Sequence, residues 1–213
     1  MIQLYNYYRS SASFRVRIAL NLKQLSYQDI AVNLIHNGGE QFTSEYLAIN
    51  PQSLVPTLKI DDKIISQSLA IMEYLEELYP YPALLPSDAY QKAQVRAFAL
   101  AIAADLHPLN NLRVLKYITN ELGLSEEKKM AWYQHWIIIG LTALEKKITS
   151  QDQKNEFCFG DTPTLADVCL VPQIYNARRY SCDLTTFPNL VRIDASCQQH
   201  PAFQKAWPTD HNI

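Results

Sequence analysis

Three serines follow a strand-like pattern and precede a helical one, so the chain must open with a strand, a tight turn and a helix. Before the turn, Ile2 and Leu4 alternate with other residues, which predicts a strand over about residues 2–8. After it, apolar residues from Phe14 to Leu20 predict a helix that Ser13 caps and that runs to about Lys23. Such a turn gathers free N–H groups and a positive helix end at one place. It suits an anion or a thiolate.

The first part of the chain mixes strand and helix signals. After the first helix we predict a second strand at 27–33 and a short helix at 40–48, which Asn50-Pro51 ends. Two short strands at 57–60 and 63–66 flank the turn signal Asp61-Asp62, and Ser68 is expected to cap a helix running to about residue 79. A βαβ unit followed by ββα predicts a four-stranded mixed sheet with helices on both faces, the thioredoxin-like arrangement. We assign this domain to residues 1–82.

The remainder, residues 87–213, lacks strand patterns and is predicted to be all-helical. A linker rich in proline covers 79–86, and a helix from Ser87 is expected to continue past Arg113 with a bend near Pro108. Ser125 is expected to cap the next helix. Thr164 to Asp167 has the spacing of a capping box, Pro172 predicts a kink, and a last helix covers about 188–199. The fold class is therefore α/β plus all-α.

Composition narrows the possible partners. The formal net charge is −2 without a basic block, which argues against nucleic acid, and no apolar run is long enough for a membrane span. Nothing after Met1 resembles an export signal. The four cysteines have no C-x-x-C spacing and the five histidines no metal-ligand spacing, so we expect reduced cysteines and no metal.

The serine turn itself contains no cysteine. Redox proteins with a thioredoxin-like fold place a cysteine at this turn, and serine cannot form a disulfide. A thiol used here must come from outside the chain. A serine hydroxyl that donates a hydrogen bond to that thiol would lower its pKa from about 8.5.

The turn resembles a long signature, S-S-C-S-x-R-V-R-I-A-L, of zeta-class glutathione transferases, which include the maleylacetoacetate and maleylpyruvate isomerases. Further blocks are similar: Asn50-Pro51 with Val55-Pro56-Thr57-Leu58, Gln67-Ser68-Leu69-Ala70-Ile71, and 108–115. The resemblance covers essentially the whole chain. It implies a thioredoxin-like glutathione-binding domain and a helical substrate-binding domain, with glutathione as cofactor.

The resemblance also implies site residues. Ser10, with Ser11, is the expected catalytic group, and Arg179 matches an arginine that faces the substrate carboxylate. Arg9 is either a second anion-attracting residue or a surface residue. Pro56 is implied to be cis. The full set of expected glutathione contacts is Ser10, Ser11, Ala12, Ser13, Phe14, Arg15, Gln41, Val55, Pro56, Gln67, Ser68, His107, Asn110, Val114, Leu115 and Lys116.

The implied activity is isomerisation of a dianionic keto acid: maleylacetoacetate, from tyrosine and phenylalanine breakdown, or maleylpyruvate. The implied assembly is a cytoplasmic homodimer. Ala12 departs from the signature's cysteine, which leaves open how that change affects the rate. Two alternatives are a general glutathione transferase for small electrophiles or haloacids, and a non-catalytic binding module.

Simpler explanations compete at several positions. Ser13 and Asp167 are expected to be structural caps, and Tyr5, Tyr7 and Tyr8 to pack rather than react. Arg15 and Arg17 are expected to be solvated or to pair across an interface. His107 either touches glutathione or closes the bend at Pro108.

Overall fold

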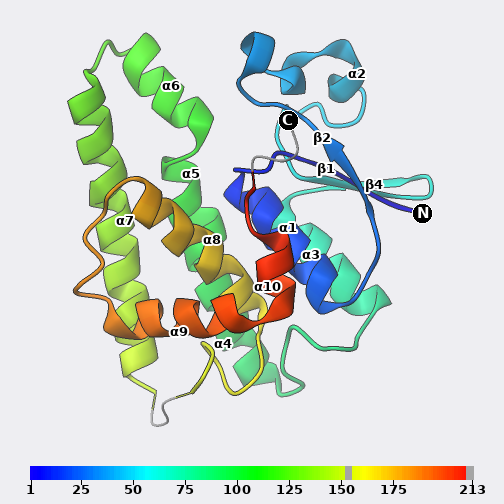
Figure 1. The fold of residues 1–213 in the computed structure, drawn as a ribbon, viewed down its shortest axis with the longest axis vertical. Coiled ribbons are helices and arrows are strands. Elements are labelled where there is room, and N and C mark those ends of the chain that lie inside the picture. The colour runs from blue at the N-terminus through cyan, green and yellow to red at the C-terminus, as the bar shows by residue number, and fades with distance from the viewer. Residues whose placement is uncertain (152–154, 210–213) are drawn as a thin grey trace. The chain divides into compact units, whose positions relative to one another are not determined.

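The structure is a computed structural model that describes residues 1–151 and 155–209 (Figure 1). It divides into two units, Leu85–Gln198 and a first unit made of Met1–Leu84 with the chain from Gln199 onward. The sequence placed everything after residue 87 in the helical domain. The end of the chain groups instead with the first unit, because α10 (Pro201–Ala206) packs on α1 (Ser11–Leu22).

The first unit is built on a four-stranded mixed sheet of order β2-β1-β3-β4. β1 pairs parallel with β2 and antiparallel with β3, and β4 pairs antiparallel with β3. This arrangement confirms the predicted thioredoxin-like sheet. The strands are β1 (Ile2–Asn6), β2 (Gln28–Ala31), β3 (Thr57–Ile60) and β4 (Lys63–Ser66).

Helices cover both faces of this sheet, with α1 and α3 on one side and α2 on the other (Figure 1). Besides α1 and α10, they are η1 (His36–Gly38), η2 (Glu40–Phe42), α2 (Ser44–Leu47) and α3 (Ser68–Leu78). α1 contacts both α3 and α10, so nearly its whole circumference is buried. Arg15 and Arg17 are only 1% and 6% exposed, and the prediction that they are solvated was wrong.

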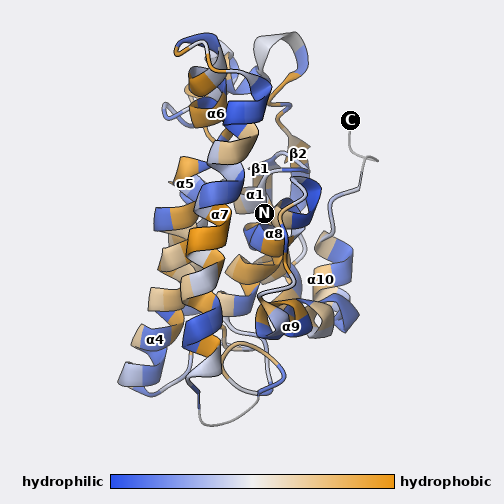
Figure 2. Cartoon of the chain, turned by 90° about the vertical axis from the view of Figure 1, so that its left-hand side faces the viewer, coloured by the Kyte–Doolittle hydropathy of each residue, from blue (hydrophilic) through white to orange (hydrophobic). Residues whose placement is uncertain are grey.

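The second unit is helical, as predicted. Its elements are α4 (Ala89–Leu100), η3 (Ala101–Leu106), α5 (His107–Leu109), α6 (Leu112–Asn120), α7 (Glu126–Thr149), α8 (Leu165–Arg179) and α9 (Pro188–Gln199). The buried residues of α7 recur at helical spacing, and Figure 2 shows the matching alternation of hydrophobic and hydrophilic residues along it. Ser125 caps α7, and Thr164 with Asp167 forms the predicted capping box of α8.

The helix expected from Ser87 is interrupted. It begins at Ala89, because the Asp88 carboxylate accepts a hydrogen bond from the Gln91 N–H at 2.9 Å. α4 passes into the π-helical turn η3 and then α5, and the chain breaks at Asn110 before α6 starts. The predicted disturbance near Pro108 is confirmed.

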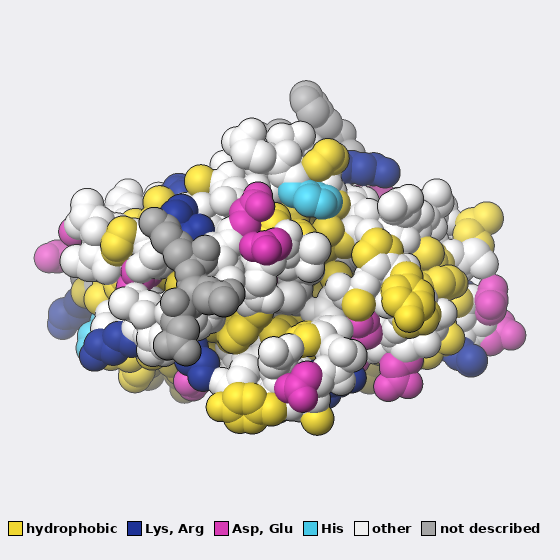
Figure 3. All heavy atoms as spheres, turned by 90° about the horizontal axis from the view of Figure 1, so that it is seen from below, with side chains coloured by type: hydrophobic (Ala, Val, Ile, Leu, Met, Phe, Trp, Pro, Cys, Tyr) yellow, Lys and Arg dark blue, Asp and Glu magenta, His cyan; other side chains and the backbone are white. Residues whose placement is uncertain are grey.

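Chemical features of the described residues limit what the protein can bind. All four cysteines are free and buried. Across 1–151 and 155–209, no group of His, Cys, Asp and Glu could hold a metal ion, and no helix has the length and hydrophobicity to cross a bilayer. On the face seen in Figure 3, Lys and Arg are scattered among acidic and uncharged groups, so that face offers no continuous basic surface.

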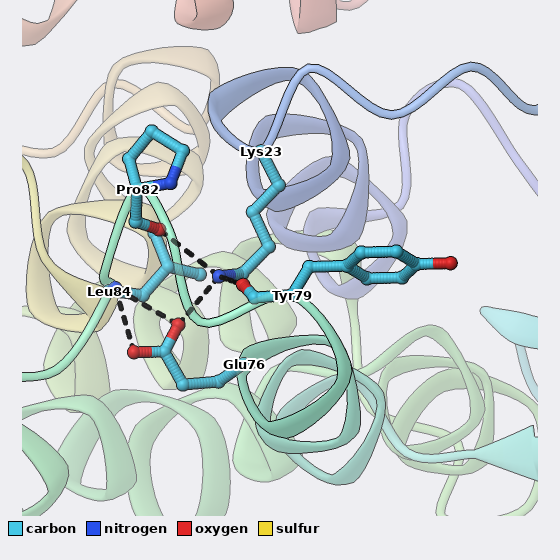
Figure 4. Close-up of polar contacts among 5 residues, drawn as sticks. All are labelled: Lys23, Glu76, Tyr79, Pro82 and Leu84. Atoms are coloured by element: carbon cyan, nitrogen blue, oxygen red, sulfur yellow. Dashed lines mark hydrogen bonds and ion pairs between the residues drawn. The ribbon is translucent and has the colours of Figure 1, made fainter.

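A buried lysine joins the ends of two helices in the first unit (Figure 4). The Lys23 ammonium lies 2.7 Å from Glu76 Oε2, and it also donates to the carbonyls of Tyr79 and Pro82 at 2.5 and 3.1 Å. Glu76 in turn accepts from the Leu84 N–H at 3.0 Å. This network fixes the course of the chain as it leaves the sheet domain.

We expect Glu145→Ala to destabilise the helical unit by about 2–3 kcal/mol. The Glu145 carboxylate is 9% exposed and accepts hydrogen bonds from Asn189 and from the Leu190 N–H, all at the start of α9. Removing it leaves these buried donors without an acceptor. Urea unfolding followed by circular dichroism measures the effect. Lys146→Ala, one residue along on an exposed position of α7, is the control and should change stability by less than about 0.5 kcal/mol.

Candidate active site

Ser10, not Ser13, is the N-cap of α1. Its backbone is extended, with φ −70° and ψ 120°, and its hydroxyl accepts a hydrogen bond from the Ser13 N–H at 3.3 Å. Capping alone would therefore account for a serine at position 10, whereas the sequence pattern assigned the cap to Ser13. The contact uses the hydroxyl as acceptor and leaves its proton available, because a hydroxyl can accept and donate together. Ser10 can therefore donate to a ligand at the helix start.

The other residues of the turn are mostly internal. Ser13 is fully buried, and its hydroxyl accepts from the Tyr7 N–H at 3.4 Å, which ties the end of β1 to α1. Ser11 and Phe14 are 4% and 1% exposed, whereas Ala12 is partly exposed. Any contact from Ser13 or Phe14 to a ligand must therefore come through the backbone.

The peptide bond between Val55 and Pro56 is cis, as the resemblance implied. The loop before it is held by Tyr46 and Asn50, which both donate to the Leu54 carbonyl, at 2.6 and 2.8 Å. Within the described residues, no hydrogen bond engages the main chain of Val55. Val55 thus presents an unused donor and acceptor, as the edge of a strand does.

The start of α3 combines two features that favour an anion. Gln67 precedes the helix with φ 73° and makes no side-chain cap, so the first N–H groups of α3 have no side-chain acceptor from it. Beside them, the buried Arg15 guanidinium donates to the Ser68 hydroxyl at 3.2 Å. A helix N-terminus next to a cation favours a carboxylate. The prediction that Ser68 caps this helix was wrong, because Gln67 holds the N-cap position and Ser68 is the first helical residue. Nothing in the sequence indicated that Arg15 lies beside Ser68.

Gln41 carries an unsatisfied polar atom. The side chain is 5% exposed, and its amide nitrogen donates weakly to the Leu34 carbonyl at 3.5 Å. Its Oε1 has no partner among the described residues. Gly39 has φ +110°, which residues with a side chain rarely adopt, and a Cβ there would meet the Gln41 amide at 2.5 Å and displace it. The buried oxygen is ready to accept from a polar ligand.

Arg9 lies just before the turn and is oriented by aromatic rings. Its guanidinium carbon is 5.1 Å from the Tyr8 ring centroid, and Nη2 donates to the Tyr7 hydroxyl at 2.8 Å. Tyr5, Tyr7 and Tyr8 pack in one cluster with Val55, as the sequence predicted. Arg9 is only partly buried, and a guanidinium is a group that binds anions well.

The other expected ligand contacts belong to the second unit. His107 lies on α5, and Asn110 follows it at the break, where its amide donates to the Tyr133 carbonyl at 3.2 Å and its Oδ1 has no partner among the described residues. On α6, Leu115 is buried, Val114 is partly exposed and Lys116 is exposed. Figure 1 places α5 and α6 consecutively along this unit.

Arg179 ends α8 in the same unit. Its guanidinium carbon lies 5.1 Å from the centroid of the Tyr180 ring, which stacks on Tyr133 at 3.7 Å. The residue is exposed, so its charge can meet a substrate carboxylate.

All four cysteine thiols are buried, and three of them are poor nucleophiles. Burial raises the pKa of Cys158 and Cys197, and it raises the pKa of Cys182 to about 11. Thiolate, not thiol, is the reactive form. A thiol reaction at the serine turn therefore needs a thiol from a ligand.

Comparison with known proteins defines the class. Residues 4–83, which contain β1 to α3, match the family of glutathione S-transferase N-terminal domains. Together with the sheet order and the uncapped start of α3, this match makes the protein a glutathione transferase by class.

Full-length relatives are more specific. A probable maleylacetoacetate isomerase of Vibrio cholerae is 49% identical over 96% of this chain and 94% of its own length. A holo maleylpyruvate isomerase, a bacterial zeta-class glutathione transferase, has a TM-score of 0.95 at 43% identity and covers 99% of this chain and 100% of its own. The maleylacetoacetate isomerase of Anaeromyxobacter dehalogenans with bound glutathione has a TM-score of 0.87 at 40% identity, with 100% and 98% coverage. The chain belongs to the zeta class of glutathione transferases.

Proposed function

We propose that this protein is a glutathione-dependent isomerase that converts a maleyl keto acid to its fumaryl isomer. Relatives named for maleylacetoacetate and for maleylpyruvate both align with nearly the whole chain, so both substrates are candidates. The observation that carries the proposal is the uncapped start of α3 beside Arg15 and Ser68, in the unit that also holds the serine turn.

The residues of the first unit fit glutathione at three chemically different places. The start of α3 suits the carboxylate of the γ-glutamyl end, and the free main chain of Val55 suits the peptide group of the cysteinyl residue. The buried Oε1 of Gln41 suits an N–H donor of the tripeptide. Each of these three places thus has a counterpart in the ligand.

When bound, glutathione supplies the sulfur nucleophile whose reversible addition lets a cis double bond rotate. The Ser10 hydroxyl donates a hydrogen bond to that sulfur and favours the thiolate, and the N-terminus of α1 adds to the effect. The positive N-terminus of α1 stabilises negative charge that develops on the substrate carbonyl oxygen.

The substrate carries two carboxylates, and the two expected substrate-binding residues are arginines. Arg9 is held by the Tyr7 hydroxyl in the first unit, and Arg179 lies at the end of α8 in the second. A guanidinium binds a carboxylate through two parallel hydrogen bonds, so the chemistry of each of these residues suits a carboxylate. Neither side chain needs to transfer a proton for the isomerisation.

We also propose that the protein acts as a cytoplasmic homodimer in the breakdown of tyrosine and phenylalanine. This inference rests on the family resemblance and on the relatives' names. Sedimentation velocity at micromolar concentration tests the assembly, and a mass of one chain would refute the dimer.

One assay tests the proposed function. The protein is mixed with glutathione and maleylacetone, and loss of the cis substrate is followed by absorbance while glutathione is assayed at the end point. We expect the trans isomer to form with glutathione recovered unchanged. Consumption of glutathione with a conjugate as product would identify a general transferase. Glutathione binding without turnover of maleylacetone or of a haloacid would identify a binding module.

A further inference from the structure

We propose that Arg17 is a positioning residue that holds the serine turn in the conformation Ser10 needs. The inference rests on the proposed function and deepens it, because it assigns to a buried arginine on α1 a role in the chemistry of the turn. Besides its hydrogen bonds, the Arg17 guanidinium carbon lies 5.3 Å from the centroid of the Phe14 ring in the turn.

The Arg17 guanidinium joins three segments of the first unit. Nη1 donates to Asn6 Oδ1 at 2.8 Å, Nη2 to the Tyr8 carbonyl at 2.9 Å, and Nε to the Ala206 carbonyl at 3.1 Å. These acceptors lie at the end of β1, within the turn, and at the end of α10. The planar guanidinium therefore holds these three segments at fixed distances from one another.

The contact to Tyr8 matters most for the site. Other backbone groups of the turn are satisfied within it: the Ser10 N–H donates to the Tyr7 carbonyl at 2.9 Å, and the Phe14 N–H donates to the Ser10 carbonyl at 2.8 Å. The Tyr8 carbonyl instead receives its hydrogen bond from a side chain on the next turns of α1. Tyr8 is two residues before Ser10, so a shift at Tyr8 moves the Ser10 hydroxyl.

Packing does not replace this contact. A cavity of about 510 Å³ adjoins the guanidinium, and its lining includes Tyr8, Arg17, Lys205 and Trp207. The described residues leave this space open beside the guanidinium, and the hydrogen bond from Nη2 gives the Tyr8 carbonyl a defined direction that packing does not supply. Asn6 strengthens the arrangement because its amide also donates to the Asp29 carboxylate on β2.

The experiment compares Arg17→Met and Arg17→Lys with the wild type. We expect Arg17→Met to lower kcat by about 10–100-fold, because small displacements of a catalytic group have effects of this size. The KM for glutathione should change much less, since Val55, Gln41 and the start of α3 remain. The pKa of the bound thiol, read from thiolate absorbance against pH, should rise by about 0.5–1 unit. Arg17→Lys should have a kcat and a thiol pKa between those of the wild type and of Arg17→Met, because an ammonium can reach one of the acceptors.

Arg192→Met is the matched control. Arg192 lies on α9 in the other unit and also donates to a carbonyl, that of Asn155, at 2.9 Å. The Arg192→Met variant should be less stable than the wild type, with no change in the pKa of the bound thiol or in kcat. Equal effects of Arg17→Met and Arg192→Met on stability, with the thiol pKa and kcat unchanged in both, would overturn the positioning role.

The wild-type arm separates this inference from the proposed function. If the wild type neither binds glutathione nor turns over maleylacetone, the proposed function fails. Amide hydrogen exchange of the peptide covering residues 7–13 then still decides the role of Arg17. Faster exchange in Arg17→Met than in Arg192→Met supports it, and equal exchange refutes it.

Discussion

Ser10→Ala is expected to lower kcat/KM by about 10²–10³-fold, the usual cost of removing one hydrogen-bond donor that stabilises a developing charge. The pKa of the bound glutathione thiol should rise toward the value of about 8.5 for an unperturbed thiol. The physical reason is the loss of the only hydroxyl that caps α1 and keeps a proton to donate. Steady-state isomerisation kinetics and a thiolate titration measure the two effects.

Two further variants separate catalysis from capping. Ser125→Ala removes the equivalent cap of α7, where the serine hydroxyl accepts from the Lys128 N–H at 3.3 Å. It should cost about 1 kcal/mol of stability and leave the kinetics unchanged. Ser10→Asp keeps an acceptor for the cap but has no proton to donate, so it should be as inactive as Ser10→Ala. Full activity in Ser10→Asp would show that the cap alone is required.

Lys23→Met is expected to destabilise the first unit by about 3–5 kcal/mol, the range for removing one partner of a buried ion pair. The Lys23 side chain has no exposed surface, and Glu76 is 14% exposed. Methionine fills the space of the lysine stem but leaves the Glu76 carboxylate and the Tyr79 and Pro82 carbonyls without their shared donor. Urea unfolding monitored by circular dichroism gives the change in the free energy of unfolding.

The double variant Lys23→Met with Glu76→Gln tests the cause. A neutral amide can still accept from the Leu84 N–H, so the double variant should be more stable than Lys23→Met alone. Lys129→Met is the control, because Lys129 pairs with the mostly exposed Glu126 and should change stability by less than about 1 kcal/mol. If Lys23→Met cost no more than Lys129→Met, the network in Figure 4 would not be a major source of stability.

Local patterns predicted much of this fold. Alternation at Ile2 and Leu4 identified β1, Asp61-Asp62 identified the hairpin of β3 and β4, and Thr164 with Asp167 identified the start of α8. These features depend on neighbours within a few residues, and a sequence displays such neighbours directly. The cis bond before Pro56 came from the family resemblance, since most bonds to proline are trans.

The errors share one cause. Ser13 looked like a cap because it precedes the apolar run, but its hydroxyl is taken by the Tyr7 N–H, and Ser10 caps the helix. Arg15 and Arg17 looked solvated because they are charged, yet α3 and α10 cover them. In each case the deciding partner lies on another segment.

By itself the sequence determined that a strand, a serine turn and a helix open the chain, that no cysteine serves at that turn, and which motifs place the protein among the zeta-class transferases. Only the tertiary structure decided which serine caps α1, that Arg15 meets Ser68 at the start of α3, and that Arg17 joins the turn to α10. The hydrogen bond from Arg15 to Ser68 joins residues 53 positions apart, and the one from Arg17 to Ala206 joins residues 189 positions apart. Such bonds depend on how the chain folds back, and no local pattern of residue types records which distant residues will meet.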